Sequence, residues 1–309
     1  MDQSSPELRW GVERRLEFIE FRLFWDGAIN RADLTEFFGV SVPQASKDLS
    51  QYQELAPGNM EYDKSQKRYF AGPKFKPRFL NPDPDVYLAQ LRSLTDGVIN
   101  RAECWIAVPP EADIALTPRR AIDVPVLRSI LQCVHENRSI EIFYQSMNNA
   151  RPDPVWRRIT PHAFGYDGFR WHVRAFCHLE DKFKDFLLPR TLSARTPGEA
   201  GAAAEADWLW QNYFDIEIGP HPALTESQKR VVAKDYGLSD GKGTLSVRYA
   251  MLFYVLKRLG LLGDAEKEDP RRQHIVAINK YDVQTALNKT EYLQDVFLNK
   301  ENIAGEKRA

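Results

Sequence analysis

The feature that most constrains how this chain folds is a change in the spacing of its apolar residues. Near the N-terminus they recur every three or four positions, which is typical of one buried face of a helix. This stripe consists of Leu8, Val12, Leu16, Ile19 and Leu23. From residue 139 to 195, short runs of alternating residues between polar turns predict β-strands instead. The chain therefore combines a helical N-terminal region with a small barrel or curled sheet.

The segment after the first helix carries the signals of two further helices. Residues 31–39 predict a short helix that is closed by Gly39. In the next helix, Ser41 and Gln44 stand in capping-box register, and Pro43 falls in the first turn, where its missing N–H does no harm. The buried face of this helix is expected to consist of Val42, Ala45, Leu49 and Tyr52.

A basic hairpin follows these helices, with MEYD and KRYF flanking the turn at 64–66. Residues 64–78 include six basic side chains and no acidic one, which suits contact with phosphates. Helices followed by such a hairpin predict a winged helix-turn-helix DNA-binding domain over 1–80. The predicted DNA contacts are Ser41, Gln44, Ser46, Lys47 and Gln51 on the helix and Lys64, Lys67 and Arg68 on the hairpin. The alternative is a three-helix domain with a solvated charged surface.

The remaining boundaries follow from composition. Proline and glycine cluster after residue 71, so 81–122 is expected to be a connector with a helix near 83–98. The β-rich domain spans 123–197 and opens with a helix at Asp123. The low-complexity stretch GEAGAAAEAD predicts a linker. A C-terminal domain over 207–300 is expected to contain a strand region at 208–219, a helix with Thr225 and Gln228 in capping-box register, a helix over 246–260 and a strand at 274–279.

One predicted strand, GFRWHVRAFC at 168–177, has an unusual pattern. Side chains alternate across a strand, so one set is expected to face the core and the other to face outward. The inward set is Trp171, Val173 and Ala175, and the outward set is Arg170, His172 and Arg174. The outward charges are either simply solvated or part of a site for an anion such as a phosphate.

Three stretches, IEIFYQS, RRITPHAFGYDGFRWHVRAFC and FKDFLLPRTLSA, resemble the WYL domain, an Sm/SH3-like β-barrel of bacterial regulators. Of the Trp-Tyr-Leu triplet that names that family, Trp171-His172-Val173 keeps only the tryptophan. FDIEIGPHPALTESQKRVVAKDYG and VRYAMLFYVLKRLG resemble the dimerisation domain of WYL regulators of phage-defence operons of the BREX and CBASS types. The resemblance implies an α+β protein with a winged helix-turn-helix, a WYL barrel and a C-terminal α/β dimerisation domain.

The resemblance also implies a function and a second site. The expected protein is a homodimeric repressor that binds a palindromic operator and senses an anionic ligand, such as a nucleotide or short nucleic acid, in the barrel. The pocket residues that it implies are Tyr144, Ser146, His162 and Arg190, beside Arg170, His172 and Arg174. Whether Arg157, Arg158 and His172 face this pocket depends on strand register, which the sequence leaves open. The identity of the ligand and the operator are also left open.

Other classes of function have little support in the sequence. A net charge of −1 means that nucleic acid would have to be met by local patches. Three cysteines without CxxC spacing, and a start without an apolar leader, predict a cytoplasmic protein without a bound metal or other cofactor. No apolar run is long enough for a membrane span. The rivals are an RNA- or nucleotide-processing enzyme that uses His162, or an accessory module that binds single-stranded nucleic acid. The lack of a catalytic motif favours a protein that is not an enzyme.

Overall fold

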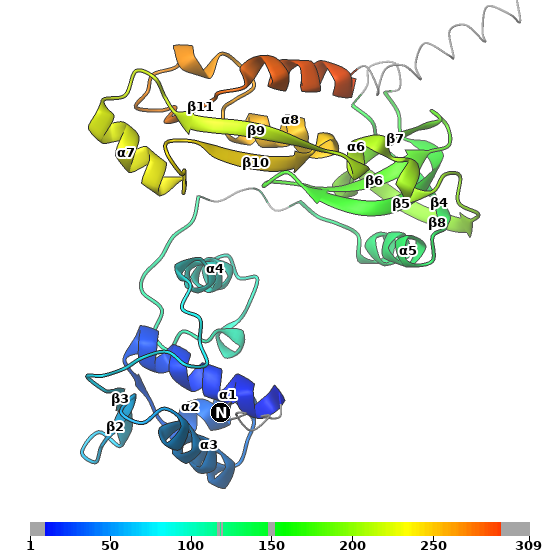
Figure 1. Cartoon of the computed structure of the whole chain (residues 1–309). Coiled ribbons are helices and arrows are strands. Elements are labelled where there is room, and N and C mark those ends of the chain that lie inside the picture. Colours follow the sequence, from blue (N-terminus) through cyan, green and yellow to red (C-terminus); the bar gives the residue numbers. More distant parts are fainter. Residues whose placement is uncertain (1–9, 116–117, 119, 148–151, 292–309) are drawn as a thin grey trace, which may run out of the picture. The chain divides into compact units, whose positions relative to one another are not determined.

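A computed structural model describes residues 10–115, 118, 120–147 and 152–291, and the chain divides into two compact units, Met1–Leu116 and Thr117–Ala309. The first unit begins with α1 (Trp10–Phe21), a π-helical turn (Arg22–Asp26) and the short strand β1 (Ala28–Ile29). Helices α2 (Arg31–Phe38) and α3 (Val42–Leu55) follow, and then the hairpin of β2 (Met60–Asp63) and β3 (Arg68–Ala71). The sheet order is β1-β3-β2, so the hairpin forms a wing beside three helices (Figure 1).

Local signals account for most of these boundaries. Gly39 ends α2 in the left-handed conformation, and the Ser41 hydroxyl accepts a hydrogen bond from the Gln44 amide at the start of α3. Only half of the predicted capping box forms, because the Gln44 side chain donates to Asp48 instead of turning back. The prediction that Val42 is buried was wrong. Its side chain is 56% exposed, since the first turn of α3 projects beyond the core.

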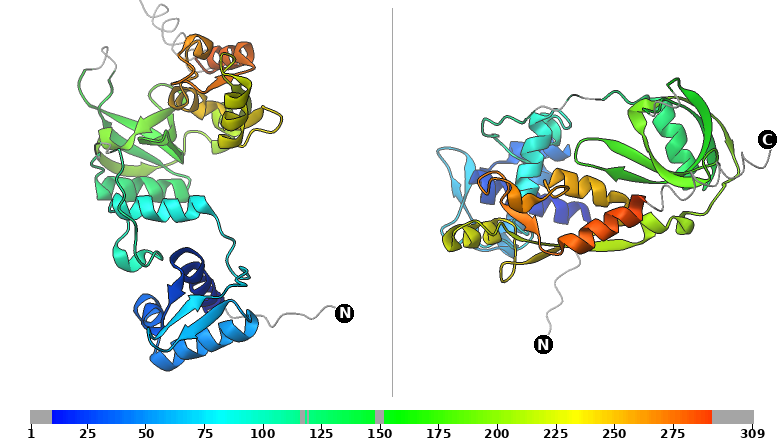
Figure 2. Two further views of the ribbon diagram at one scale, coloured as in Figure 1. Left: turned by 90° about the vertical axis from the view of Figure 1, so that its left-hand side faces the viewer. Right: turned by 90° about the horizontal axis from the view of Figure 1, so that it is seen from above.

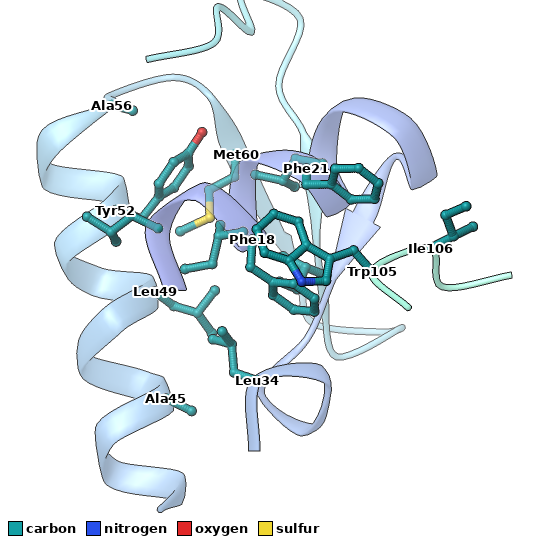
Figure 3. Close-up of a cluster of buried hydrophobic side chains, with 14 of the residues drawn as sticks. Phe18, Phe21, Leu34, Ala45, Leu49, Tyr52, Ala56, Met60, Trp105 and Ile106 are labelled. Atoms are coloured by element: carbon teal, nitrogen blue, oxygen red, sulfur yellow. The ribbon is translucent and has the colours of Figure 1, made fainter. Parts of the chain in front are cut away.

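The core of the first unit also includes part of the predicted connector (Figure 3). Trp105 and Ile106, which follow α4 (Pro84–Thr95) and a 3₁₀ turn (Arg101–Glu103), lie beside Phe18 and Phe21. The Trp105 ring meets both phenyl rings edge-on, at centroid distances of 5.5 and 5.4 Å. Burying an aromatic ring in this way stabilises the unit by a few kcal/mol, so the chain as far as residue 106 folds with the winged helix.

The second unit begins with α5 (Val124–His135), which Asp123 caps, and a curved antiparallel sheet (Figure 2). Its strands are β4 (Ser139–Tyr144), β5 (Val155–Tyr166), β6 (Trp171–Cys177), β7 (Lys182–Leu187) and β8 (Thr191–Gly198). Their order is β7-β6-β5-β4-β8, with a 3₁₀ turn (Leu188–Arg190) between β7 and β8. Val173 and Ala175 face the core, as predicted. Trp171 does not: it is 48% exposed at the end of β6, where its ring packs on Tyr166.

The C-terminal part of this unit is a three-stranded sheet covered by helices (Figure 1). Its elements are α6 (Trp208–Gln211), β9 (Tyr213–Pro220), α7 (Glu226–Asp235), β10 (Gly243–Arg248), α8 (Tyr249–Arg258) and β11 (Ile275–Ala277), with 3₁₀ turns at Ala204–Ala206 and Ala265–Lys267. Strand β9 lies between β10 and β11. The predicted capping box at Thr225 and Gln228 is confirmed.

Two predicted boundaries in the C-terminal part were wrong. The strand expected from 208 starts only at Tyr213, because Asp207 caps the short helix α6. The helix expected from 246 starts at Tyr249, because Ser246 to Arg248 pair with β9 as part of β10. Among the described residues, no helix is long and apolar enough to cross a membrane.

Candidate functional sites

The outer face of α3 carries the residues that the sequence places against DNA. Lys47 is fully on the exposed side of the helix, and Gln44 and Gln51 are half-buried beside it. Ser41 is exposed at the N-cap, whereas Ser46 lies on the flank toward α2, where its hydroxyl is 3.5 Å from the Arg31 guanidinium. Ser41, Gln44 and Lys47 therefore lie at the N-terminal half of α3, which is the part of a recognition helix that reaches base edges.

A buried carboxylate fixes the orientation of Gln44. Asp48 is fully buried and receives two hydrogen bonds from the Arg15 guanidinium on α1, at 2.6 and 3.1 Å. Gln44 Nε2 donates to the same carboxylate at 2.8 Å. Asp48 engages one N–H of the Gln44 amide. The other N–H and Oε1 are a donor and acceptor pair of the kind that complements N7 and N6 of adenine.

The wing is shaped by a carboxylate at its tip. Asp63 Oδ1 accepts hydrogen bonds from the Ser65 amide, the Ser65 hydroxyl and the Gln66 amide, which together form a tight turn. These bonds hold the pKa of Asp63 below its ordinary value. Lys64 and Lys67 are exposed at this turn, while Arg68 is half-buried within β3. The tip therefore presents lysines rather than Arg68 to the solvent.

A second buried carboxylate fastens the trailing chain to α1 and α3. Glu20 is fully buried and accepts hydrogen bonds from the Arg78, Phe79 and Leu80 amides at 2.6–2.9 Å. The Tyr52 hydroxyl on α3 donates to Glu20 at 2.9 Å. Charged acceptors make strong hydrogen bonds to backbone amides, so Glu20 fixes α3 relative to the segment after the wing.

The face of β6 that carries His172 and Arg174 was predicted to be open to solvent. Acidic residues cover it instead. The Arg174 side chain is 1% exposed and donates from Nε and Nη2 to the two oxygens of Asp207, at 2.7 and 3.0 Å. Its Nη1 lies 3.2 Å from Asp185 on β7. His162 Nε2 is 3.0 Å from the same Asp207 carboxylate. Arg174 thus joins the β-sheet to the segment that leads into α6, and its charge is neutralised.

Ionisation of Asp207 is set by two opposing effects. Burial raises the pKa of Asp207, but hydrogen bonds from His162 and Arg174 outweigh it, and the net pKa lies below the ordinary value. The ionised Asp207 carboxylate is the form that accepts these hydrogen bonds, so this network is intact at neutral pH.

A neighbouring network surrounds His172 and Arg170. Asp167, in the turn between β5 and β6, receives hydrogen bonds from Arg170 Nε at 2.9 Å and lies 3.1 Å from His172 Nε2. Burial opposes ionisation of Asp167, yet these bonds lower its pKa to about 2. The ring of Tyr254 on α8 packs 4.8 Å from the His172 ring, and its hydroxyl donates to Asp185. Burial raises the pKa of the Tyr254 hydroxyl.

The remaining predicted pocket residues lie elsewhere on the sheet. Tyr144 is buried within the barrel core, where its ring packs on Phe186 and its hydroxyl accepts from the Leu187 amide. Ser146 and Arg190 are half-buried near the end of β4, where the Gln145 amide donates to the Arg190 carbonyl. Tyr144 thus lies on the core face of the sheet with Val173 and Ala175, whereas His172 and Arg174, which alternate with those two residues, lie on the opposite face.

Strand register settles how the two arginines of β5 are directed. Arg157 points inward, 4% exposed, with its guanidinium over the Tyr144 and Phe186 rings and 3.0 Å from Glu180. Arg158 points to the opposite face, where it contacts the Ser139 hydroxyl and Glu141. Among the described residues, no group of three or more His, Cys, Asp or Glu side chains is arranged to hold a metal ion.

Comparison with known families identifies the three parts of the chain. The descriptions that match are "BrxR transcriptional regulator winged helix-turn-helix domain" over residues 11–93, "WYL domain" over 125–196 and "BrxR transcriptional regulator, C-terminal dimerization domain" over 213–283. These matches and the fold define a transcriptional regulator with a winged helix, a WYL domain and a dimerisation domain.

Full-length relatives narrow this class. The "DNA-binding transcriptional repressor CapW" of Stenotrophomonas maltophilia is 40% identical over 283 residues, which cover 90% of this chain and 93% of that protein. Proteins of the same name from Escherichia coli (strain KTE188) and Pseudomonas aeruginosa are 37% and 36% identical, covering 91% and 89% of this chain and 93% and 91% of theirs. The chain belongs to this BrxR/CapW family of DNA-binding transcriptional repressors.

One solved structure also aligns with the chain. It is that of "Proteasome accessory factor B/C (PafBC) of Arthrobacter aurescens", with 16% identity and a TM-score of 0.27 over 89% of this chain and 45% of that one. Similarity at this level adds nothing to the assignment above.

Proposed function

We propose that this protein acts in the cytoplasm as a homodimer that represses its own or a neighbouring phage-defence operon by binding a palindromic operator through α3 and the wing. The observation that carries the proposal is the Arg15–Asp48–Gln44 arrangement, which holds a base-reading amide in a fixed orientation on the exposed face of α3. A side chain that is ordered before binding loses little rotamer freedom on contact with DNA.

The role of the wing follows from its charge. Lys64 and Lys67 are exposed at the tip, and Lys74 and Lys76 are exposed on the chain that Glu20 holds in place. Lysines at these positions contact phosphates, which orient the protein on the duplex without reading sequence.

Dimerisation gives the operator its symmetry. A single winged helix contacts too few base pairs to specify one operator. Two half-sites are therefore expected, spaced by about one helical turn or a multiple of it. The C-terminal domain carries exposed apolar side chains that a second copy would cover, among them Leu262 at 37%, Ile278 at 40% and Tyr281 at 81% exposure. These three residues are proposed to lie in the dimer interface.

Release from the operator is proposed to follow ligand binding in the WYL region. A ligand changes operator affinity only if it binds more tightly to a conformation that is misplaced for the half-sites. The Arg174–Asp207 ion pair joins the sheet to the start of α6, and the hydrogen bond from Tyr254 to Asp185 joins it to α8. We propose that these two contacts transmit the effect of ligand binding to the dimerisation domain.

Operator binding by a Lys47 variant tests the DNA-reading proposal. In a fluorescence-anisotropy titration, Lys47→Glu is expected to abolish specific binding, and Lys47→Ala to reduce the slope of log affinity against log salt by about one. Lys234→Glu on α7, an exposed lysine of the C-terminal domain, is the matched control and should bind normally. Unchanged operator affinity in Lys47→Glu would remove α3 from the reading role.

A further inference from the structure

A pocket lies between the β5–β6 turn and the end of α8. Of the residues predicted for the WYL pocket, its lining includes Arg170 but not Tyr144, Ser146 or Arg190. It has a volume of about 380 Å³ and is lined by Asp167, Gly168, Phe169, Arg170, Tyr254, Lys257 and Arg258. Its walls therefore come from both the WYL sheet and the C-terminal domain. A volume of this size accommodates a ligand as large as a mononucleotide.

The pocket is positively charged. Lys257 and Arg258 are exposed, and within the described part of the chain neither side chain has a hydrogen bond or a carboxylate partner. Asp167 is the sole acidic residue of the lining, and it is already paired with Arg170 and His172. Unpaired cations facing a concave surface without a free carboxylate favour an anionic ligand.

The guanidinium of Arg258 lies against the backbone of the turn. A Cβ at Gly168 would come within 2.7–2.9 Å of the Arg258 guanidinium atoms, so this group lies close to the backbone, and the φ of +88° at this position favours glycine. The exposed Arg258 side chain thus borders the pocket beside this turn. Its planar group matches the paired oxygens of a phosphate.

An aromatic ring stands beside these cations. Phe169 is 42% exposed, and the Arg120 guanidinium lies 5.0 Å from its ring centroid. An exposed phenyl ring next to several cations is suited to a ligand with a planar ring and a phosphate, because the ring stacks while the cations bind the phosphate.

We propose that this pocket binds a nucleoside monophosphate or a nucleotide of similar size, with Lys257 and Arg258 on the phosphate and Phe169 against the base. Tyr254 forms part of the lining and donates to Asp185, which contacts Arg174, so an occupied pocket abuts the network that joins the sheet to α6. The regulatory consequence rests on the proposed repressor function, whereas binding itself does not.

Calorimetric titration of the full-length dimer with the four 5′-monophosphates, with inorganic phosphate and with adenosine tests the proposal. At least one monophosphate is expected to bind, with phosphate and adenosine each at least about tenfold weaker, because each lacks one of the two contacts. Lys257→Gln combined with Arg258→Gln should weaken binding at least about tenfold. Arg230→Gln combined with Lys234→Gln, which removes the same charge from α7, should not.

Three results would overturn the proposal. These are no binding by any monophosphate at millimolar concentration, binding that the Lys257/Arg258 double variant retains, or loss of operator affinity in that variant without nucleotide, which would make the cluster a DNA contact. Operator binding by the wild-type protein, measured in parallel, tests the repressor function separately, so failure of one proposal is distinguishable from failure of the other.

Discussion

Replacing Asp207 with alanine removes the one carboxylate that Arg174 and His162 share. Removing one partner of a buried ion pair typically costs about 3–5 kcal/mol, because the remaining charge stays desolvated. Arg174 keeps its contact with Asp185 at 3.2 Å, which places the expected loss near the lower end, at about 3 kcal/mol of unfolding free energy. The second unit should lose this stability and the first unit should not.

Two measurements check this expectation. Urea denaturation at fixed dimer concentration gives the unfolding free energy, and hydrogen exchange of β5 and β6 shows whether the loss falls on the sheet that carries Arg174. Asp215→Ala is the control, since Asp215 is exposed on β9, and it should stay within about 0.5 kcal/mol of wild type.

A double variant separates the ion pair from the packing around it. Arg174→Met combined with Asp207→Ala leaves no unpaired guanidinium, and we expect it to recover more than about 1 kcal/mol relative to the sum of the single variants. A loss below about 1 kcal/mol in Asp207→Ala, or strict additivity in the double variant, would refute a structural role for this pair.

Three further expectations concern DNA reading, acid stability and assembly. Gln44→Ala should relax discrimination at one base pair of the operator by about 1–3 kcal/mol, measured by titrating single-base operator variants, whereas Ser50→Ala should leave every position unchanged; equal effects at all positions would argue against base reading. The pKa values of Asp207 and Asp167 are lowered in the folded state, so their stabilisation is complete above the ordinary carboxyl pKa of about 3.9 and is lost as pH falls toward about 2, the pKa of Asp167. Acid titration followed by circular dichroism should therefore show the second unit weakening below about pH 4, and a stability that is flat to pH 2 would contradict this sign. Tyr281→Asp should shift the protein toward monomers in light scattering with its fold retained, and an unchanged dimer would place the interface elsewhere on the C-terminal domain.

The sequence alone predicted the structure correctly where local signals determine it. Glycine and capping residues fixed the ends of α2 and α3, and alternation placed Val173 and Ala175 in the sheet core. The prediction from sequence was wrong or incomplete where the position of a side chain depends on a partner far away in the chain. Asp207 ends a low-complexity stretch that was predicted to be a linker. Its side chain is nevertheless 1% exposed and forms an ion pair with Arg174, 33 positions earlier in the chain. Alternation identified the face that Arg174 occupies but gave no indication of what covers it.

The same limit applies to the proposed DNA-reading surface. Helical spacing placed Gln44 and Lys47 on an outward face of α3, but it could not show that Arg15 and Asp48 orient the Gln44 amide. The role of Glu20 could not be predicted for a similar reason. Its partners are the backbone amides of residues 78–80, and hydrogen bonds to backbone amides leave no signature in the sequence. Buried carboxylates that organise a site from another element are found only once the fold brings the elements together.

A footprint on the DNA upstream of the protein's own gene tests the central claim most directly. A dimeric repressor that reads the major groove through α3 should protect two symmetric half-sites, with centres separated by about 10 base pairs or a multiple of this spacing, and Lys47→Glu should erase that protection. Protection without two-fold symmetry, or protection that survives in Lys47→Glu, would contradict the account.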